Sequence, residues 1–487
     1  MTVQKLAEGI PHRILQGSAD APITGVVYDT RAIRGGEAFV CIVGTKRDAH
    51  EFIPQAVEAG ASAVVVTKEV TAPEGVTVIR VEDDRKALAA MAANWFGHPS
   101  ESLTTIGITG TKGKTTTAYM IYHMLNGAGI SCGLIGTVEN IIGTEHIPAS
   151  HSTPESYVVQ EYMAKMRDAG CKAVVMEVSS QGLKMDRVFG INYDYGLFTN
   201  LGHDHIGGDE HPDFEDYKNC KKKLFSQCRK GIFNADDEHF PQMKEGCTCE
   251  VVTFGSAAGC DYEMTEQTLL NEPGRKGVAY RVRGKADLAV EVDIPGRFNM
   301  FNSLAAVALG CEMGIAKETI LSVLKSVHVR GRVESVPVSD RFTVLLDYAH
   351  NGMSLQSLLT TLREYQPKRL VCMFGCGGNR AKDRRYDMGE ISSKMADLTI
   401  VTSDNPRFEE PDAIIADILV GVAKGPGAYV TVPDRREAIA YALSHAEDGD
   451  CIVIAGKGHE DYQEIKGVKY PMDDRKMILE EAERLGI

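Results

Sequence analysis

A turn rich in glycine, threonine and lysine carries the clearest chemical signal in the sequence, Gly110-Thr111-Lys112-Gly113-Lys114-Thr115-Thr116. A β-branched run precedes this turn, and an amphipathic helical pattern follows it. Strand, turn and helix in this order place backbone N–H groups and a helix start around an anion. We therefore expect a nucleotide-phosphate site, in which Lys114 reaches the β- and γ-phosphates and the Thr115 hydroxyl holds Mg²⁺.

The turn departs from the usual P-loop spacing, because Ile108 stands where that spacing places a glycine. The motif is therefore a shorter form. The alternative is a surface turn between a strand and a helix that contains Gly-Lys-Thr by chance. The strand before the turn and the helix after it favour the phosphate site.

Polar residues also follow two other apolar strands of the same region. Glu177 lies near the end of the strand expected at 173–178, and His205 follows the strand expected at 193–199. Ligands of open α/β sheets bind at the carboxyl ends of the strands, so we expect Thr115, Glu177 and His205 to converge on one crevice. Such a set suits a hard cation. The alternatives are a salt-bridged carboxylate for Glu177 and a capped loop for His205.

Strands and helices alternate along most of the chain, which is typical of α/β folds. At 487 residues the chain is too long for one core, and three domains are expected. We predict a small N-terminal α/β domain over 1–98, a central P-loop domain with a doubly wound parallel sheet over 99–331, and a C-terminal Rossmann-like α/β domain over 332–487. In the central domain a helix is expected at 154–169, with Ser152 and Thr153 as candidates for its N-cap.

The C-terminal region contains four apolar strands, each of which ends in a polar or glycine-rich turn. The strands are expected at 342–346, 370–374, 398–402 and 451–454. Parallel strands present their carboxyl ends at one sheet edge, so these turns indicate a second ligand site. The segment at 216–225 is basic, and a solvated basic helix face is the simplest interpretation of it.

Composition excludes several classes of function. The formal net charge of −14 argues against a general nucleic-acid binder. No apolar run approaches the length of a membrane helix, and no signal peptide is recognisable. The twelve cysteines are scattered, with Cys247-x-Cys249 as the closest pair and without zinc-type spacing. We expect a cytoplasmic, monomeric enzyme with reduced thiols that binds neither nucleic acid nor membrane.

These motifs together resemble the Mur ligase family, and within it the branch called MurE, which adds the third residue of the peptidoglycan stem peptide. The resemblance spans nearly the whole chain, and the short phosphate turn is a trait of that family. Its carriers are the turn at 110–116, Met176-Glu177-Val178-Ser179-Ser180-Gln181-Gly182-Leu183, Phe198-Thr199-Asn200-Leu201 with Asp204-His205, Asp347-Tyr348-Ala349-His350, Phe374-Gly375-Cys376-Gly377-Gly378-Asn379-Arg380, Asp404-Asn405-Pro406-Arg407 and Ala455-Gly456-Lys457-Gly458-His459-Glu460-Asp461-Tyr462.

The resemblance implies a reaction. ATP phosphorylates the D-Glu γ-carboxylate of UDP-N-acetylmuramoyl-L-alanyl-D-glutamate to an acyl phosphate, and the amine of an incoming amino acid then displaces phosphate. Mg²⁺ ions and Lys114 neutralise the repelling anions. The implied catalytic residues are Lys114, Lys221 and His205, and the implied metal ligands are Thr115, Glu177, His205 and Lys221. The implied ATP contacts are Gly110, Thr111, Lys112, Gly113, Lys114, Thr115, Thr116, Asn302, Arg332 and Asp347.

In this family pattern Lys221 is carbamylated by CO₂, which converts an ammonium into an anionic oxygen donor for the metal. The run from Lys221 to Lys223 makes the position ambiguous by a residue. Because Arg332 and Asp347 lie in the third domain, the resemblance also implies a closing hinge step.

The resemblance further implies contacts to the UDP-sugar dipeptide by Thr30, Thr45, Lys46, Arg47, Asp48, Ser152, Thr153, Ser179 and Arg187. By their composition alone, the turns around Thr30 and Asp48 are ordinary solvated loops. Ser152-Thr153-Pro154-Glu155 stands where many relatives have Thr-Thr-Gly, and 207–211 replaces a more usual Asp-Tyr-His.

The incoming amino acid is implied to be read by Arg380, Asp404, Asn405, Arg407, Gly456 and Glu460. The sequence Asp404-Asn405-Pro406-Arg407 resembles the signature for meso-diaminopimelate, whose distal carboxylate a guanidinium can pair with bidentately. The alternatives are the same reaction with L-lysine, a folylpolyglutamate- or cyanophycin-type ligase, and a nucleotide-dependent switch without ligase activity.

Overall fold

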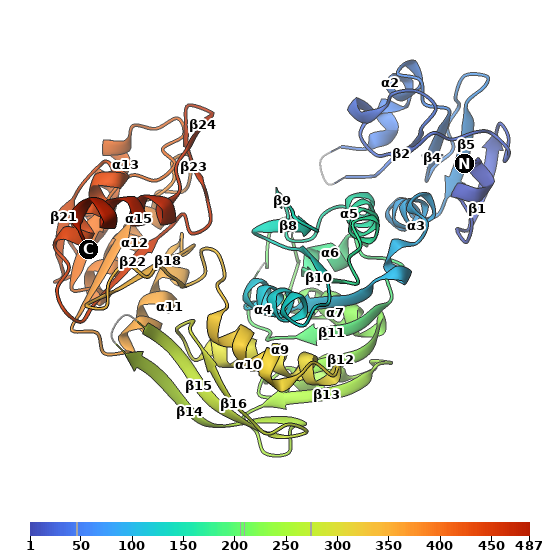
Figure 1. Ribbon diagram of the computed structural model, residues 1–487. Coiled ribbons are helices and arrows are strands. Elements are labelled where there is room, and N and C mark those ends of the chain that lie inside the picture. Colours follow the sequence, from blue (N-terminus) through green and yellow to red (C-terminus); the bar gives the residue numbers. More distant parts are fainter. Residues whose placement is uncertain (45–46, 205, 209, 273–274) are drawn as a thin grey trace. The chain divides into compact units, whose positions relative to one another are not determined.

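The computed structural model describes residues 1–44, 47–204, 206–208, 210–272 and 275–487. The chain forms two compact units, and each is described here by itself (Figure 1). Unit 1 comprises Met1–Asp261 and Ala305–Ile315, and unit 2 comprises Tyr262–Leu304 and Ala316–Ile487. Among the described residues no helix is long and apolar enough to cross a membrane. The predicted boundaries at residues 98 and 331 stay a prediction.

The N-terminal part of unit 1 is a five-stranded sheet in the order β1-β5-β4-β3-β2. Its strands are parallel except β1, which pairs antiparallel with β5. One core cluster joins the sheet to α1 and α3, and a second joins it to α2. The elements are α1 (Val3–Leu6), β1 (His12–Gln16), β2 (Val26–Val27), η1 (Thr30–Ala32), β3 (Ala38–Val40), η2 (Ala49–Phe52), α2 (Ile53–Glu58), β4 (Ala63–Val66), β5 (Thr77–Val81), α3 (Asp84–Phe96) and η3 (Pro99–Ser102).

The central part of unit 1 is built on six parallel strands in the order β7-β10-β6-β11-β12-β13, with β8 and β9 added antiparallel beyond β7. The predicted parallel sheet is therefore confirmed. Its elements are β6 (Thr104–Thr109), α4 (Lys114–Gly127), β7 (Cys132–Ile135), β8 (Glu139–Ile142), β9 (Glu145–Pro148), α5 (Ser156–Asp168), β10 (Ala173–Glu177), α6 (Ser180–Lys184), β11 (Tyr193–Phe198), α7 (Phe214–Lys222), η4 (Lys223–Ser226), β12 (Cys228–Asn234), α8 (Phe240–Lys244) and β13 (Glu250–Gly255).

The two faces of this sheet have different helical cover. Val174 and Met176 of β10 belong to a buried cluster with Val159 and Met163 of α5. Side chains alternate along a strand, so Val175 points to the opposite face. Helix α4 packs on β10, β7 and β6, and its residues are absent from the α5 cluster. The helices therefore cover both faces, as a doubly wound sheet requires.

The predicted cap of α5 is wrong. The helix begins after Glu155, which makes no side-chain cap bond. The hydroxyls of Ser152 and Thr153 are engaged elsewhere: Ser152 Oγ lies 2.8 Å from Thr137 Oγ1, and Thr153 Oγ1 donates to the Glu177 carbonyl at 2.9 Å. These two residues therefore form hydrogen bonds near the ends of neighbouring strands and do not cap the helix.

Unit 2 contains an antiparallel set, β14-β15-β16, with α10 packed on β16. It also contains a six-stranded sheet in the order β17-β18-β22-β19-β20-β21, parallel except for β17, which confirms the four predicted parallel strands. The elements are β14 (Tyr262–Glu272), β15 (Arg275–Gly284), β16 (Leu288–Val292), α10 (Lys317–Ser326), β17 (Glu334–Ser335), β18 (Thr343–Asp347), α11 (Gly352–Arg363), β19 (Arg369–Phe374), α12 (Asp383–Met395), β20 (Leu398–Val401), α13 (Pro411–Val422), β21 (Ala428–Thr431), α14 (Arg435–Ser444), β22 (Asp450–Ala455), the hairpin β23 (Tyr462–Ile465) and β24 (Val468–Pro471), and α15 (Asp474–Leu485). Helix α9 (Phe298–Glu312) includes the unit boundary between residues 304 and 305.

Candidate active site

The predicted phosphate turn lies between β6 and α4 and needs its two glycines. Gly113 precedes α4 with φ of 86°, which is left-handed backbone that favours glycine. Gly110 has φ of 154°, and a Cβ there would lie 2.0 Å from Thr199 Oγ1. Any larger residue at 110 would therefore collide with the loop that follows β11.

The start of α4 presents backbone donors. The first intrahelical bond of α4 runs from Thr117 N to the Gly113 carbonyl at 2.9 Å. The N–H groups of Thr115 and Thr116 precede that bond, in the turn where a helix leaves its donors for a cap or an anion. This arrangement fits the phosphates of a nucleotide.

The loop after β11 fixes the turn in place. Asn200 Oδ1 accepts from Lys112 N at 2.9 Å, and Asn200 Nδ2 donates to the Lys112 carbonyl at 2.9 Å. Thr199 Oγ1 donates to the same carbonyl at 2.7 Å. The Thr111 N–H donates to the Asn200 carbonyl at 2.9 Å. Thr199 and Asn200 carried the family resemblance, but sequence analysis assigned them no role.

Two lysine ammoniums meet at one carbonyl of the turn. Lys114 Nζ donates to the Gly110 oxygen at 2.7 Å, and Lys221 Nζ donates to it at 2.8 Å. Lys221 is only 1% exposed and lies 4.5 Å from the centre of the Tyr217 ring. Burial, followed by the Lys114 charge, lowers the pKa of Lys221 well below its usual value.

The interpretation of 216–225 as a solvated basic face is therefore wrong for Lys221. Within the run of three lysines, Lys222 is half-buried and Lys223 is exposed. Lys223 Nζ instead donates to the Leu183 carbonyl at 3.2 Å. Of the three lysines, Lys221 is thus the one whose ammonium lies at the phosphate turn.

Glu177 and Thr115, two of the predicted metal ligands, lie together. Thr115 Oγ1 donates to Glu177 Oε2 at 2.9 Å, and the carboxylate also accepts from Thr137 N at 2.7 Å and Thr137 Oγ1 at 2.9 Å. Glu177 is 1% exposed and makes no ion pair with any residue that the structure describes. The salt-bridge alternative is therefore wrong. Carboxylate and hydroxyl oxygens are the donors that Mg²⁺ prefers. His205 lies outside the described residues.

The predicted dipeptide contacts adjoin this carboxylate. Ser152 Oγ lies 2.8 Å from Thr137 Oγ1, whose single proton is donated to Glu177, so the Ser152 hydroxyl donates to Thr137. Thr153 Oγ1 accepts from Ser179 N at 3.0 Å and lies 3.1 Å from Ser179 Oγ, which caps the start of α6. Predicted metal ligands and predicted substrate contacts therefore share one hydrogen-bonded network.

Arg187 completes this side of the network. Its Nη1 donates to the Thr153 carbonyl at 3.0 Å, and its Nη2 lies 2.8 Å from Glu155 Oε1. Its Nε is buried and has no hydrogen-bond partner among the described residues. Buried donors in proteins are normally satisfied, so an unsatisfied guanidinium N–H fits an anionic ligand.

Sequence analysis missed a brace between α6 and α7. His211 Nε2 lies 3.0 Å from Ser180 Oγ, and His211 Nδ1 lies 2.7 Å from Asp216 Oδ2. Lys184 Nζ donates to the same carboxylate oxygen at 2.8 Å. Lys184 and His211 hold the pKa of Asp216 below its usual range. Because Lys221 lies on α7, this brace fixes it relative to α6.

The predicted uridine contacts are only partly described. Thr30 begins η1, Arg47 is exposed, and Thr45 and Lys46 lie outside the described residues. Asp48 is engaged within the protein: its carboxylate lies 2.5 Å from His50 Nδ1 and 2.6 Å from Lys68 Nζ. Hydrogen bonding, first from Lys68 and then from His50, lowers the pKa of Asp48 strongly.

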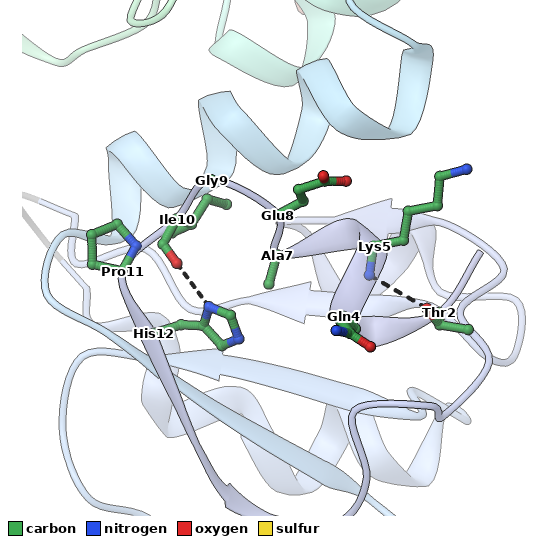
Figure 2. A pocket seen from close by; sticks show the side chains of 9 residues that line it. All are labelled: Thr2, Gln4, Lys5, Ala7, Glu8, Gly9, Ile10, Pro11 and His12. Carbon is green, nitrogen blue, oxygen red and sulfur yellow. Dashed lines mark hydrogen bonds between the residues drawn. The ribbon is translucent and has the colours of Figure 1, made fainter.

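An open pocket near the N-terminus contains none of the predicted site residues. Figure 2 shows it between α1 and the start of β1. His12 Nδ1 lies 2.7 Å from the Ile10 carbonyl, and the Lys5 N–H donates to Thr2 Oγ1, so these polar groups bond to neighbours in sequence (Figure 2). The pocket therefore offers no convergent set of ligand-binding groups.

Three predicted ATP contacts lie in unit 2. Asn302 is buried and donates to Asn299 Oδ1 at 2.8 Å. Asp347 accepts from the backbone N–H groups of Val333 and Ala349, both at 2.8 Å, and burial raises its pKa. The guanidinium of Arg332 lies 5.1 Å from the centre of the Tyr348 ring. Asp347 is thus held rigidly at the end of β18.

Five of the six predicted amino-acid contacts follow the carboxyl ends of β20 and β22, and the sixth, Arg380, follows β19. Asn405 Nδ2 donates to Glu460 Oε2 at 2.9 Å. A Cβ on Gly456 would lie 3.1 Å from Asp404 Oδ2, so this glycine lets the chain pass close to a carboxylate. Lys457 carried the family resemblance, but sequence analysis assigned it no role. It is fully buried and donates to Asn405 Oδ1 at 3.3 Å and to the Tyr462 carbonyl.

Arg407 and Arg380 differ in how firmly they are held. Arg407 Nη1 donates to the Gly378 carbonyl at 2.7 Å, and its Nε donates to Glu464 Oε2 at 3.2 Å. Its φ of 53° is left-handed, which is uncommon for a non-glycine residue. Arg380 is exposed in the turn after β19. The fixed guanidinium of Arg407 suits recognition of a carboxylate.

Family models match three stretches of the chain. The description "Mur ligase family, catalytic domain" matches residues 22–96, "Mur ligase middle domain" matches 108–310, and "Mur ligase, glutamate ligase domain" matches 331–458. The UDP-N-acetylmuramoyl-L-alanyl-D-glutamate--2,6-diaminopimelate ligase of Clostridium perfringens is 38% identical over 487 residues, 99% of each chain. The ligase of the same name from Caldanaerobacter subterraneus is 40% identical over 481 residues, which cover 99% of this chain and 98% of the relative.

Solved structures give the same result. A structure of a UDP-N-acetylmuramoyl-L-alanyl-D-glutamate--2,6-diaminopimelate ligase superposes with a TM-score of 0.74 at 26% identity, covering 100% of this chain and 99% of that one. The MurF ligase of Thermotoga maritima in complex with ADP shares the fold alone, with a TM-score of 0.57 at 18% identity over 95% of this chain and 97% of that one. The protein described here belongs to the Mur ligase family.

Proposed function

We propose that this protein is an ATP-dependent ligase that joins meso-diaminopimelate to the D-Glu γ-carboxylate of UDP-N-acetylmuramoyl-L-alanyl-D-glutamate, in peptidoglycan precursor synthesis. The printed names of the relatives support this substrate pair. One structural observation carries the proposal. A continuous set of hydrogen bonds runs from Thr115 at the phosphate turn through Glu177 and Thr137 to Ser152. A nucleotide phosphate and an acceptor carboxylate can therefore bind side by side.

The chain's own groups prepare the phosphoryl transfer. The backbone N–H groups at the start of α4 and the Lys114 ammonium bind and orient the phosphates. Thr115 and Glu177 would hold Mg²⁺, which supplies charge neutralisation between the γ-phosphate and the carboxylate when it is bound. Arg187, with its unsatisfied Nε, would orient the acceptor carboxylate. Transfer of the γ-phosphoryl group to the carboxylate forms the acyl phosphate and leaves ADP. The amine of diaminopimelate then attacks the acyl carbon, the bond from that carbon to the phosphate oxygen breaks, and phosphate leaves.

The environment of Lys221 supports its carbamylation. Only a neutral amine reacts with CO₂, and burial together with the Lys114 charge favours the neutral form. A carbamate keeps one N–H for the Gly110 carbonyl, to which the amine now donates. It also adds two oxygen acceptors of the kind that a hard cation binds. We include Lys221 and His205 in the proposed second metal site on the family pattern.

Arg407 supports diaminopimelate over lysine. Its Nε and Nη1 donate to Glu464 and to the Gly378 carbonyl, which fixes the guanidinium in the turn that also contains Asp404 and Asn405. The remaining N–H groups of the guanidinium are left for a ligand. A planar guanidinium binds a carboxylate through two parallel hydrogen bonds, and lysine lacks the distal carboxylate of diaminopimelate. Arg380, Gly456 and Glu460 complete the proposed amino-acid site. We further propose the nucleotide roles of Asn302, Arg332 and Asp347, and the uridine roles of Thr30, Thr45, Lys46, Arg47 and Asp48.

An amino-acid panel tests the proposal. The full chain is incubated with ATP, Mg²⁺ and the UDP-sugar dipeptide, and phosphate release is measured with meso-diaminopimelate, L-lysine and no amino acid. We expect release that depends on the amine and is fastest with diaminopimelate. Release that ignores both substrate and amine would favour the nucleotide-dependent switch, and a preference for lysine would refute only the specificity.

A conservative variant sharpens the specificity test. Arg407→Lys keeps the positive charge but loses the planar guanidinium that binds a carboxylate through two hydrogen bonds. A hydrogen bond to a charged group contributes roughly 1.5–3 kcal/mol, so the KM for diaminopimelate should rise about 10- to 100-fold. Arg341→Lys serves as the control, because Arg341 is an exposed arginine of unit 2 that belongs to none of the proposed sites. An unchanged KM in Arg407→Lys would contradict the proposed role.

A further inference from the structure

Three thiols gather where β12 and β13 begin, in unit 1. Cys228 is the first residue of β12, Cys249 immediately precedes β13, and Cys247 lies two residues earlier. All three are free thiols. The two strands are parallel neighbours with Lys230 opposite Glu250, so Cys228 and Cys249 lie at adjacent strand starts. The proposed ligase function does not use these cysteines.

A pair of glycines makes room for two of the sulfurs. Gly196 of β11 and Gly231 of β12 are register partners on neighbouring strands. A Cβ on Gly196 would lie 2.9 Å from Cys228 Sγ, and a Cβ on Gly231 would lie 2.8 Å from Cys249 Sγ. The two sulfurs therefore lie on one face of the sheet, in the space that side chains at these two neighbouring positions would fill.

The two thiols differ in exposure and acidity. Cys228 is buried, whereas Cys249 is half-buried and reachable from solvent. A hydrogen bond from the Cys228 thiol lowers the pKa of Cys249 to about 6, and the same bond and burial raise the pKa of Cys228. The lowered pKa favours the thiolate of Cys249, which is the reactive form of cysteine, and the raised pKa favours the protonated thiol of Cys228.

We propose that Cys249 is a site of reversible oxidation by peroxides, with Cys228 as the thiol that resolves it. The Cys249 thiolate attacks one peroxide oxygen, the O–O bond breaks, and a sulfenic acid and hydroxide form. The Cys228 sulfur then displaces the sulfenic oxygen as water, which forms the S–S bond. Two thiols lose two electrons in total, and one hydrogen peroxide is reduced to two waters.

The order of the two steps follows from the site. While Cys249 is a thiolate, its charge holds the proton on Cys228. A sulfenic acid is neutral, so the first oxidation removes that charge and eases deprotonation of Cys228. The pair lies at the amino-terminal ends of β12 and β13, and the phosphate turn follows the carboxyl end of β6, so the disulfide would form at the sheet edge opposite the nucleotide.

Alkylation of the full chain tests the thiolate. At pH 6 Cys249 should react with iodoacetamide about tenfold faster than an ordinary thiol, because its larger thiolate fraction outweighs the lower nucleophilicity of an acidic thiol. Half-buried Cys311 is the internal reference, read by peptide mass spectrometry. The advantage should disappear in Cys228→Ala, which removes the donor, and remain in Cys247→Ser. Equal rates for Cys249 and Cys311 in the unmodified protein would overturn the proposal.

Peroxide treatment tests the disulfide. One equivalent of hydrogen peroxide should produce a Cys228–Cys249 linkage that dithiothreitol reverses, in the unmodified protein and in Cys247→Ser alike. Cys228→Ser, or Cys228→Ala if serine disturbs folding, should instead accumulate a sulfenic acid on Cys249 that dimedone traps. A Cys247–Cys249 linkage, or oxidation that starts elsewhere and leaves Cys249 reduced, would refute the assignment.

Discussion

Glu177→Gln is the sharpest test of the proposed metal site. The carboxylate accepts three hydrogen bonds, from Thr115 Oγ1, Thr137 N and Thr137 Oγ1. Glutamine has nearly the same shape, and its Oε1 can still accept from Thr137 N. Its Nε2 would face the two hydroxyls, which can rotate to accept instead of donate. The substitution therefore removes the negative charge while keeping most of the packing.

The expected effects on stability and on catalysis differ in size. A hydrogen bond to a charged group contributes about 1.5–3 kcal/mol, and a neutral one about 0.5–1.5 kcal/mol. Since the hydroxyls can reorient, we expect a loss of roughly 1–2 kcal/mol in the free energy of unfolding. Loss of a preorganised group that stabilises transition-state charge costs about 10²–10³ in kcat. The Mg²⁺ concentration for half-maximal activity should also rise at least about tenfold, because an anionic ligand is lost.

The assay measures ADP formation against Mg²⁺ concentration, with urea unfolding in parallel. Glu139→Gln is the matched control, because Glu139 is also a buried carboxylate of unit 1 and bonds to Tyr119 at 2.7 Å and His146 at 2.8 Å. The control should lose comparable stability and keep the Mg²⁺ dependence of the unmodified enzyme. If Glu177→Gln keeps kcat and its Mg²⁺ dependence within about twofold, the metal role of Glu177 is refuted.

Three further predictions concern buried or paired charges. Lys221→Met should abolish ligation. In CO₂-free buffer, the free energy of unfolding of the unmodified protein should increase as pH rises toward 10.5, because the pKa of Lys221 is lower in the folded than in the unfolded state. Urea unfolding should show this increase in the unmodified protein and not in the variant. Asp48→Asn should cost about 1 kcal/mol at pH 7, and acid titration of stability should bring the two proteins together once pH falls through the depressed pKa of Asp48. Arg435→Met, which leaves fully buried Asp474 unpaired, should cost about 3–5 kcal/mol in urea unfolding, and Arg435→Met with Asp474→Leu should recover most of it.

The parts of the site that sequence predicts best are those fixed by strand ends. A buried parallel strand is a continuous apolar run, and the next residues must lie at the carboxyl edge of the sheet. This reasoning placed Glu177 near the end of β10 and the phosphate turn after β6, and both are where the structure has them. The same reasoning predicted the turns after β18, β19, β20 and β22.

The parts that sequence misses depend on register between distant segments. Thr137 contacts Glu177 because β7 and β10 pair with Leu134 opposite Val175, and no local pattern encodes that pairing. The hydroxyl of Thr153 has the right chemistry and position for a helix cap, yet it bonds to the end of β10. Lys457 follows Gly456 in a turn that looks solvated, but the strands around it bury its ammonium completely.

The position of Lys221 shows that burial, which the sequence does not reveal, determines which of the three lysines at 221–223 lies at the phosphate turn. Adjacent residues of a helix are separated by about 100°, so a run of three lysines contains one that can point inward, and the sequence does not say which. In the structure Lys221 shares the Gly110 carbonyl with Lys114, which brings two positive charges together in a region of low dielectric. Such a pair is costly unless one amine becomes neutral or an anion joins it. A carbamate on Lys221 and the phosphates of ATP each meet that condition. The electrostatics of this turn therefore favour both carbamylation of Lys221 and binding of ATP, which the proposed reaction requires.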